Sequence, residues 1–332
     1  YKKITIIYIQ CLVIKILKFN LVILLLISIW IWTSKDVLVK EKQIYQVNHG
    51  ASIGTVAKDL GAKKWINSEL FFNSLSKLIG ANQKLQSGYY QIDPNMSVLN
   101  FLENISSGNV ITTKVTLIEG KTLNHYFEQL SSDSSLRSED TLEEIMQSLG
   151  IAGPYDGWFY PETYQFNYGE SVRNVLARSF QVMQEKVNEL WDDRANNLPF
   201  KSPYEAIILA SLIEKETALD QEKSLISGVF IRRLEKGMRL QTDPTVIYAL
   251  GDSYKAPLKK SDLKVDSLYN TYKYNGLPPG AISSVGYESL YAAFHPDEGN
   301  DLYFVSKKDG SHAFASNYEE HKDNIKRYSN NI

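Results

Sequence analysis

The sequence predicts an α+β protein with one transmembrane helix at its N-terminus. A long apolar segment ends at Trp32 and is followed by short strand-like segments that alternate with capped helices. Beyond these, we expect a mixed α/β domain. That domain contains a helical segment at 202–217 that is apolar on almost every face, as in buried helices, and that ends in Glu214-Lys215-Glu216-Thr217.

Length and composition exclude several classes of protein. The 332 residues allow about two domains, and a net charge of -2 gives no electrostatic reason to bind nucleic acid. Five His and a single Cys leave no Cys/His metal cluster and no internal disulfide. No Gly-rich phosphate loop and no GxSxG nucleophile motif is present. We therefore expect no cofactor, no metal and no nucleic-acid partner.

The membrane helix is predicted from Cys11 or Leu12 to Trp32. Residues 21–32 alone are too short to cross about 30 Å of hydrocarbon, and the preceding segment supplies the missing length. Trp30 and Trp32 would lie at the far interface. The alternative is a buried core helix.

Lysines set the expected orientation of this helix. Lys2, Lys3, Lys15 and Lys18 lie before or within its start, which favours a cytoplasmic N-terminus, although Lys35, Lys40 and Lys42 reduce the bias. No A-x-A-like cleavage site follows Trp32, so an uncleaved anchor is expected. We predict a cytoplasmic stub and anchor at 1–33, with the rest of the chain outside the cytoplasm.

A weak repeat follows the anchor. Strands near Gln46, Gln91 and Thr116 each lead through a polar turn into a helix with a Ser or Thr cap. The predicted caps are Ser52, Ser97 and Thr122. The first two units resemble a LysM-like fold, so residues 34–110 are predicted to form a LysM-like module. Its role as a binding unit or as a spacer stays open.

The helical segment at 202–217 is expected to begin with a capping box. Ser202 would be the N-cap, Pro203 the first helical residue and Glu205 the reciprocal partner. At the other end, burial and the negative pole of the helix dipole favour the protonated forms of Glu214 and Glu216. A glutamic acid of this kind can donate a proton near neutral pH.

The positions of Glu214 and Glu216 on the helix do not show which of the two is the proton donor. At about 100° per residue they point to nearly opposite sides, so one cleft is not expected to use both equally. The alternative is a charged helix end paired with Lys or Arg. Arg232 and Arg233, on a helix predicted at 225–236, could neutralise one of the two.

Several polar segments follow that helix. Asp243 precedes Pro244 and is interpreted as an N-cap rather than as a catalytic group. Loops at 269–272 and 275–282 are rich in amide, hydroxyl, Gly and Pro residues and are expected to position a ligand. Strands are predicted at 302–306 and 311–314, and His295 and His312 are isolated.

Six motifs in this order carry a family resemblance: ASLIEKET, RLQTDPTVIY, YNTY, GLPPGAI, AAFHP and YFVSKKDGSHAF. With them, nearly the whole chain resembles the endolytic murein transglycosylases of the YceG-like family. The resemblance implies a single-pass protein of the bacterial inner membrane with a periplasmic catalytic domain, here 111–332. It further implies cleavage of nascent peptidoglycan glycan strands between N-acetylmuramic acid and N-acetylglucosamine, and proximity to peptidoglycan synthases.

The family's catalytic glutamate matches Glu216. The resemblance implies a product with a 1,6-anhydro-muramic end, formed when the muramic C6 hydroxyl attacks C1 of its own sugar. Such a reaction needs one acid that then serves as base, because the nucleophile already belongs to the substrate. Glu214 would pair with Arg232 or Arg233. The candidate substrate-binding residues are Glu214, Gln241, Asp243, Asn270, Tyr272, Gly276 and Pro278.

Two other functions remain open at this point. A hydrolase that used Asp243 or Glu214 as a second carboxylate would release reducing ends. A membrane-tethered scaffold that binds glycan would not depend on Glu216 for its action.

Overall fold

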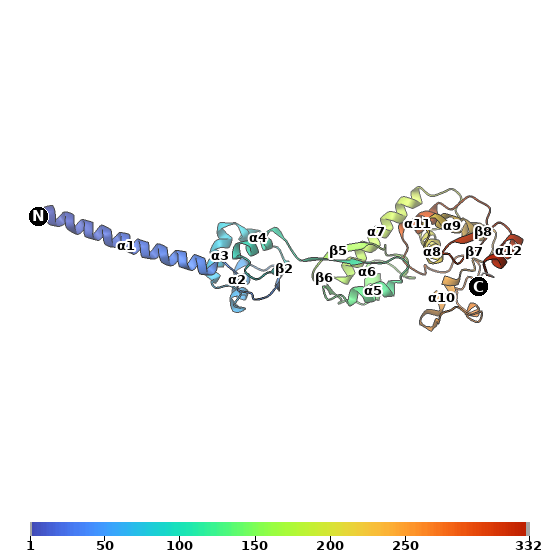
Figure 1. The fold of residues 1–332 in the computed structure, drawn as a ribbon, viewed down its shortest axis with the longest axis horizontal. Coiled ribbons are helices and arrows are strands. Elements are labelled where there is room, and N and C mark those ends of the chain that lie inside the picture. Colours follow the sequence, from blue (N-terminus) through green and yellow to red (C-terminus); the bar gives the residue numbers. More distant parts are fainter. Residues whose placement is uncertain (1, 330–332) are drawn as a thin grey trace. The chain divides into compact units, whose positions relative to one another are not determined.

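The computed structural model describes residues 2–329, with side chains from Val13 to Tyr328. Tyr1, the first residue of the predicted stub, and the last three residues of the predicted C-terminal domain lie outside this range. The chain divides into two compact units (Figure 1). Unit 1 comprises residues 1–113 and 167–169, and unit 2 comprises residues 114–166 and 170–332. Mixed helices and strands confirm the α+β class.

Unit 1 begins with α1 (Lys2–Ser34). Its segment Val13–Ser34 is apolar and long enough to cross a membrane, and side chains from Val13 to Trp32 are exposed rather than packed inside the protein. The uncovered Leu and Ile side chains suit a lipid environment better than water. The chain thus has one N-terminal helix suited to a single-pass anchor, close to the range expected from the sequence.

The rest of unit 1 is a small α+β module. Strands β1 (Gln43–Val47) and β2 (Gly88–Ile92) pair antiparallel, with Tyr45 opposite Tyr90. The helical elements of the module are α2 (Ile53–Ala62), α3 (Glu69–Leu78), η1 (Ala81–Gln83) and α4 (Val98–Ser107). The predicted caps are confirmed, because Ser52 accepts from the Thr55 amide and Ser97 from the Asn100 amide.

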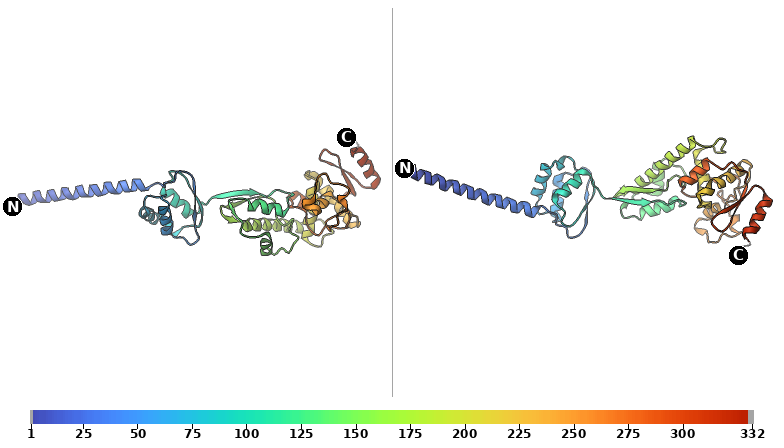
Figure 2. Two further views of the ribbon diagram at one scale, coloured as in Figure 1. Left: turned by 90° about the horizontal axis from the view of Figure 1, so that it is seen from below. Right: turned by 45° about the horizontal axis from the view of Figure 1, so that its top comes forward.

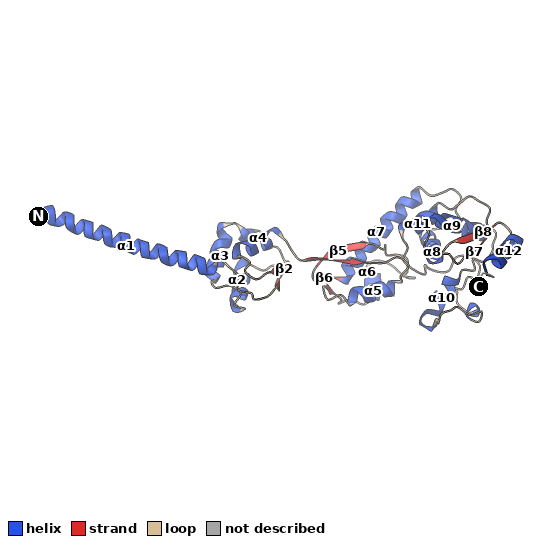
Figure 3. Cartoon of the chain, in the orientation of Figure 1, coloured by secondary structure: helices blue, strands red, loops and turns tan. Residues whose placement is uncertain are grey.

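The first half of unit 2 builds one apolar core around α7 (Val172–Asp192). Its other elements are β3 (Thr112–Thr116), α5 (Leu123–Ser131), β4 (Leu136–Arg137), α6 (Leu142–Ser148), β5 (Thr163–Asn167) and β6 (Glu170–Ser171). β3 pairs with β5 and β4 with β6, each as a two-stranded sheet (Figure 3). The third predicted cap, Thr122, accepts from the His125 amide at the start of α5.

The second half of unit 2 surrounds α8 (Pro203–Glu216). Its remaining elements are α9 (Asp220–Glu235), α10 (Asp243–Leu250), η2 (Gly251–Ser253), η3 (Asp262–Lys264), α11 (Tyr287–Phe294), β7 (Tyr303–Ser306), β8 (His312–Ala315) and α12 (Tyr318–Ser329). Helices α7, α9, α10 and α11 all contact α8, and β7 pairs antiparallel with β8 (Figure 2). Residues 206–213 of α8 are each at most 4% exposed. Removal of this much apolar surface from water fixes α8 in place.

The capping box predicted at the start of α8 is wrong. Ser202 is the N-cap residue, but its side chain makes no capping hydrogen bond. The Glu205 carboxylate accepts from the Lys201 amide at 2.6 Å and therefore does not reach back to Ser202. The predicted proline in the first turn is confirmed, since α8 begins at Pro203.

Two further elements differ from expectation. α9 begins at Asp220, five residues before the predicted start. Its first turn was not predicted because that turn is polar and carries no apolar periodicity. α12 was not predicted, since its sequence is strongly polar and only its contacts with β7 and β8 place it.

A glycine pair tests how closely the aromatic segment at 157–160 packs on α8. Gly157 has φ +86°, and an added Cβ would lie 2.6 Å from the Ala281 Cβ and 2.7 Å from the Ile207 Cγ2. Gly150 has φ +73° with nothing within 4 Å. We expect Gly150→Ala to lower the free energy of unfolding by about 1–2 kcal/mol, the cost of a left-handed backbone. Overpacking should cost Gly157→Ala about 1–3 kcal/mol more. Denaturant unfolding checks this, and equal losses would contradict the close packing.

Candidate functional site

Glu216, the last residue of α8, lines a pocket of about 450 Å³ that we call the glutamate pocket. The pocket draws its walls from α9, the start of α10, β7, β8 and α12, all within unit 2. The lining residues are Glu216, Arg233, Leu240, Gln241, Asp243, Tyr272, Tyr303, Phe304, Val305, Ser306, His312, Tyr318, His321 and Ile325.

Opposing influences act on the pKa of the Glu216 carboxyl group. Burial raises its pKa to about 6, and the nearby charge of Asp243 acts in the same direction. A hydrogen bond donated by the Thr242 hydroxyl to Oε1 opposes this shift, as do His312 and Arg233. A carboxyl with this pKa is partly protonated near neutral pH and can act both as acid and as base.

Thr242 is itself held rigidly by two other buried threonines. Its amide donates to the Thr271 hydroxyl at 3.0 Å, and its carbonyl accepts from the Thr245 hydroxyl at 2.7 Å. The hydroxyls of Thr245 and Thr271 lie 2.9 Å apart, and all three residues are at most 2% exposed. Thr242 was not predicted as a site residue, because 26 residues separate it from Glu216 and no spacing pattern links the two.

Asp243 is not a helix cap, so that interpretation is wrong. It is the first residue of α10, and the N-cap position belongs to Thr242. Its Oδ1 accepts a hydrogen bond from the Tyr272 hydroxyl at 2.5 Å, which directs the carboxylate to the glutamate pocket. Gln241, also in the pocket wall, has φ +52°, an uncommon left-handed backbone for a residue other than glycine.

Glu222 of α9 fixes the ring of His312 in the pocket wall. Its Oε2 lies 2.7 Å from His312 Nδ1, while Oε1 accepts from the His312 backbone amide at 2.9 Å. Both side chains are about nine-tenths buried. His312 looks isolated in the sequence, but in the structure it has a carboxylate partner 90 residues away. Among the residues that the structure describes, no group of His, Cys, Asp and Glu could hold a metal ion.

Arg233 brings a positive charge to the same wall. Its guanidinium donates to the carbonyls of Leu240 and Leu302, both at 2.7 Å, and it lies 5.3 Å from the Tyr303 ring centre. Burial lowers the pKa of Arg233. Arg233 acts on Glu216 through its charge, since the described residues include no ion pair between the two.

Glu214 lies on another side of α8. Its Oε2 accepts from the Ser289 hydroxyl at 2.5 Å and the Gly286 amide at 3.3 Å, and it lies 3.9 Å from Lys223 Nζ. The predicted pairing with Arg232 or Arg233 is wrong. Arg232 donates to the carbonyls of Asp297 and Asp301, and Arg233 is used as described above.

Three other predicted binding residues also lie away from the glutamate pocket. Asn270 is 0% exposed, and its side chain donates to the carbonyls of Leu263 and Val265. It therefore shapes the loop that carries Tyr272. Gly276 and Pro278 line a different pocket of about 500 Å³. Of the predicted residues, the structure thus gathers Glu216, Gln241, Asp243 and Tyr272 in one pocket.

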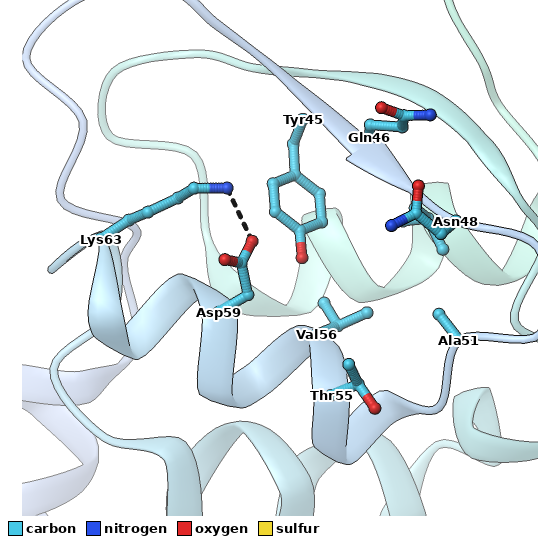
Figure 4. A pocket seen from close by; sticks show the side chains of 9 residues that line it. Tyr45, Gln46, Asn48, Ala51, Thr55, Val56, Asp59 and Lys63 are labelled. Atoms are coloured by element: carbon cyan, nitrogen blue, oxygen red, sulfur yellow. Dashed lines mark hydrogen bonds and ion pairs between the residues drawn. The ribbon is translucent and has the colours of Figure 1, made fainter.

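Unit 1 has a pocket of its own, of about 360 Å³, between β1 and α2 (Figure 4). On its rim Lys63 Nζ lies 2.6 Å from Asp59 Oδ2 and 4.9 Å from the ring centre of Tyr45. Burial and the neighbouring Asp59 raise the pKa of Tyr45. These contacts hold the end of α2 against β1, so the Lys63–Asp59 pair has a structural role.

The chain is similar to known proteins over most of its length. The family model described as the YceG-like family matches residues 45–327. A Bacillus subtilis (strain 168) protein named endolytic murein transglycosylase is 30% identical over 301 residues, which cover 84% of this chain and 82% of that protein. A Streptococcus pneumoniae serotype 2 protein of the same name is 25% identical over 322 residues, covering 86% of this chain but only 58% of that protein.

A solved structure is similar as well. The crystal structure of a YceG-like protein from Listeria monocytogenes has 29% sequence identity and a TM-score of 0.52, and the match covers 86% of this chain and 99% of that chain. These findings confirm the resemblance drawn from the six motifs. The chain belongs to the YceG-like family.

Proposed function

We propose that the protein is a lytic transglycosylase that cuts peptidoglycan glycan strands internally, between N-acetylmuramic acid and N-acetylglucosamine. The observation that carries the proposal is the Glu216 carboxyl, whose pKa is raised to about 6 by desolvation in a pocket lined by polar and aromatic side chains. The name shared by the Bacillus and Streptococcus relatives supports the same reaction class.

The proposed reaction uses Glu216 twice. The protonated carboxyl donates its proton to the glycosidic oxygen, and the bond from muramic C1 to that oxygen breaks with the electron pair leaving on the oxygen. The Glu216 carboxylate then accepts the proton of the muramic C6 hydroxyl as that oxygen attacks C1. The acid is regenerated, no water is consumed, and the products are a 1,6-anhydro end and a free 4-hydroxyl.

Three pocket residues are proposed to bind the strand around the scissile bond. Tyr272 and Asp243 already form one hydrogen-bonded pair beside Glu216, and the exposed Gln241 side chain adds an amide. A hydrolase that used Asp243 as a second carboxylate is the competing reaction, because Asp243 lies in the same pocket.

The proposed location is the cytoplasmic membrane, with the N-terminus inside and unit 2 in the periplasmic space. The single apolar span in α1 supports the anchor, and the lysines before it support the orientation. Proximity to peptidoglycan synthases would follow from action on nascent strands. In this proposal residues 34–110, within unit 1, form a LysM-like module, and residues 111–332 form the catalytic domain built on α8.

Replacement of the acid tests the proposal directly. We expect Glu216→Gln to lower kcat by about 10²–10⁴-fold, because an amide cannot donate the proton that the leaving oxygen needs. Mass spectrometry of fragments from uncross-linked peptidoglycan should show anhydro ends with the parent and a correspondingly reduced yield of them with the variant. Reducing ends from the parent would indicate a hydrolase, and equal cleavage by both proteins would remove Glu216 from the mechanism.

The pH dependence of the reaction should move in opposite directions in two variants. The Thr242 hydroxyl stabilises the ionised form of Glu216, so Thr242→Val should raise the Glu216 pKa and shift the alkaline limb of the kcat profile to higher pH. Asp243 opposes ionisation, so Asp243→Asn should shift that limb to lower pH. His312 and Arg233 are unchanged in both variants. Shifts of the same sign would show that Glu216 does not control this limb.

The neighbouring glutamate should behave differently. Glu214→Gln weakens the bonds to Ser289 and Gly286 and leaves the buried Lys223 ammonium with Asp220 alone, at 2.9 Å. We expect a loss of about 1–3 kcal/mol in the free energy of unfolding, with kcat of the folded enzyme retained. Thermal unfolding and kcat measured on the same sample separate the two effects. A loss of kcat without a loss of stability would place Glu214 in the reaction.

A further inference from the structure

We propose that a second cavity, here called the lateral cleft, binds the part of the glycan strand that continues beyond the glutamate pocket. The inference rests on the proposed function, since it assigns an additional binding site for the same substrate. The lateral cleft measures about 850 Å³ and lies between α5, the end of α8 and α10, all in unit 2. Residues around it include Asn124, His125, Glu128, Lys215 and Tyr248.

The two cavities share a rim. On α8, Lys215 lines the lateral cleft while the next residue, Glu216, lines the glutamate pocket. On α10, Pro244 lines the cleft while Asp243 lines the pocket. Because adjacent residues of the same two helices line both cavities, the end of α8 and the start of α10 lie between them. A strand that crosses this rim passes directly from one cavity to the other.

The lining of the lateral cleft suits a sugar chain. Asn124, His125 and Glu128 stand exposed on the first turns of α5 and offer both donors and acceptors. The floor is formed by partly or fully buried groups, with Tyr248 and Ile282 giving it apolar surface. Sites with an apolar floor and a few convergent polar groups are typical of small polar ligands such as saccharides.

The walls of the cleft are fixed by buried contacts. Asp156 Oδ1 accepts from the Leu123 amide and Oδ2 from the Tyr248 hydroxyl, both at 2.6 Å. Burial raises the pKa of Asp156, and these two donors use its oxygens, so it ties α5 to α10 rather than reacting. Lys215 Nζ donates to the Gly120 carbonyl and ties the end of α8 to the segment before α5.

An internal cut also requires more room than the glutamate pocket offers. At about 450 Å³ that pocket is near the lower part of the range of about 300–1,000 Å³ that single small ligands fill. Endolytic cleavage needs sugar rings bound on both sides of the scissile bond. The adjoining lateral cleft supplies the space for the rings on one of those sides.

A bulky substitution in the cleft tests the inference. Asn124→Trp should fill the cleft, and Gln147→Trp, at an exposed position of α6 outside it, is the matched control. With the full chain in detergent micelles and long peptide-free glycan strands, we expect Asn124→Trp to raise KM about tenfold with kcat nearly unchanged. Gln147→Trp should behave as the parent.

Binding measured without turnover separates this inference from the proposed function. In the Glu216→Gln background, Asn124→Trp should weaken the binding of peptide-free strands about tenfold. Anhydro products from the parent together with equal KM values in both Trp variants would overturn the cleft while leaving the reaction intact. An effect seen only with strands that carry stem peptides would make the peptide the occupant and overturn the assignment to the glycan. If the parent makes no anhydro ends, the binding comparison still decides the role of the cleft.

Discussion

The hydrogen bond from the Thr242 hydroxyl to Glu216 is the contact on which the site depends. Burial of the end of α8 favours the neutral acid, and this hydrogen bond favours the carboxylate. The pKa of about 6 is the result of that opposition. The same contact joins α8 to the start of α10, so the position of α10 and the protonation of the acid are set together. A displacement of α10 would therefore change the pKa of Glu216.

The last turn of α8 illustrates how a buried helix distributes its polar residues. Glu214 bonds to α11 and its flank, Lys215 to the segment before α5, and Glu216 to the residue before α10. Each of these consecutive side chains meets a different neighbour because the helix is surrounded and successive residues turn by about 100°. Glu214 therefore binds α8 to α11 through hydrogen bonds, while Glu216 faces the glutamate pocket.

The sequence predicted the features that depend on local interactions. The caps Ser52, Ser97 and Thr122 needed only a side chain and an amide three residues on. The same rule failed at Ser202, whose expected partner Glu205 accepts from the Lys201 amide instead, and at Asp243, which lies inside α10 and accepts from the Tyr272 hydroxyl. Thr242 and the Glu222 partner of His312 could not be predicted, since these contacts span 26 and 90 residues of sequence.

α10 is anchored at both ends, which bears on how a single acid can suffice. The buried threonines hold its start, and the Tyr248 hydroxyl bonds to Asp156, 92 residues away in sequence. A nucleophile that belongs to the substrate gains its advantage only if the reacting sugar is held in one orientation, since the intramolecular attack depends on alignment. A fixed rim between two cavities can hold the strand on either side of that sugar. The rigidity of α10 would then serve the role that a second carboxylate serves in a hydrolase, because it positions the attacking group instead of activating a water.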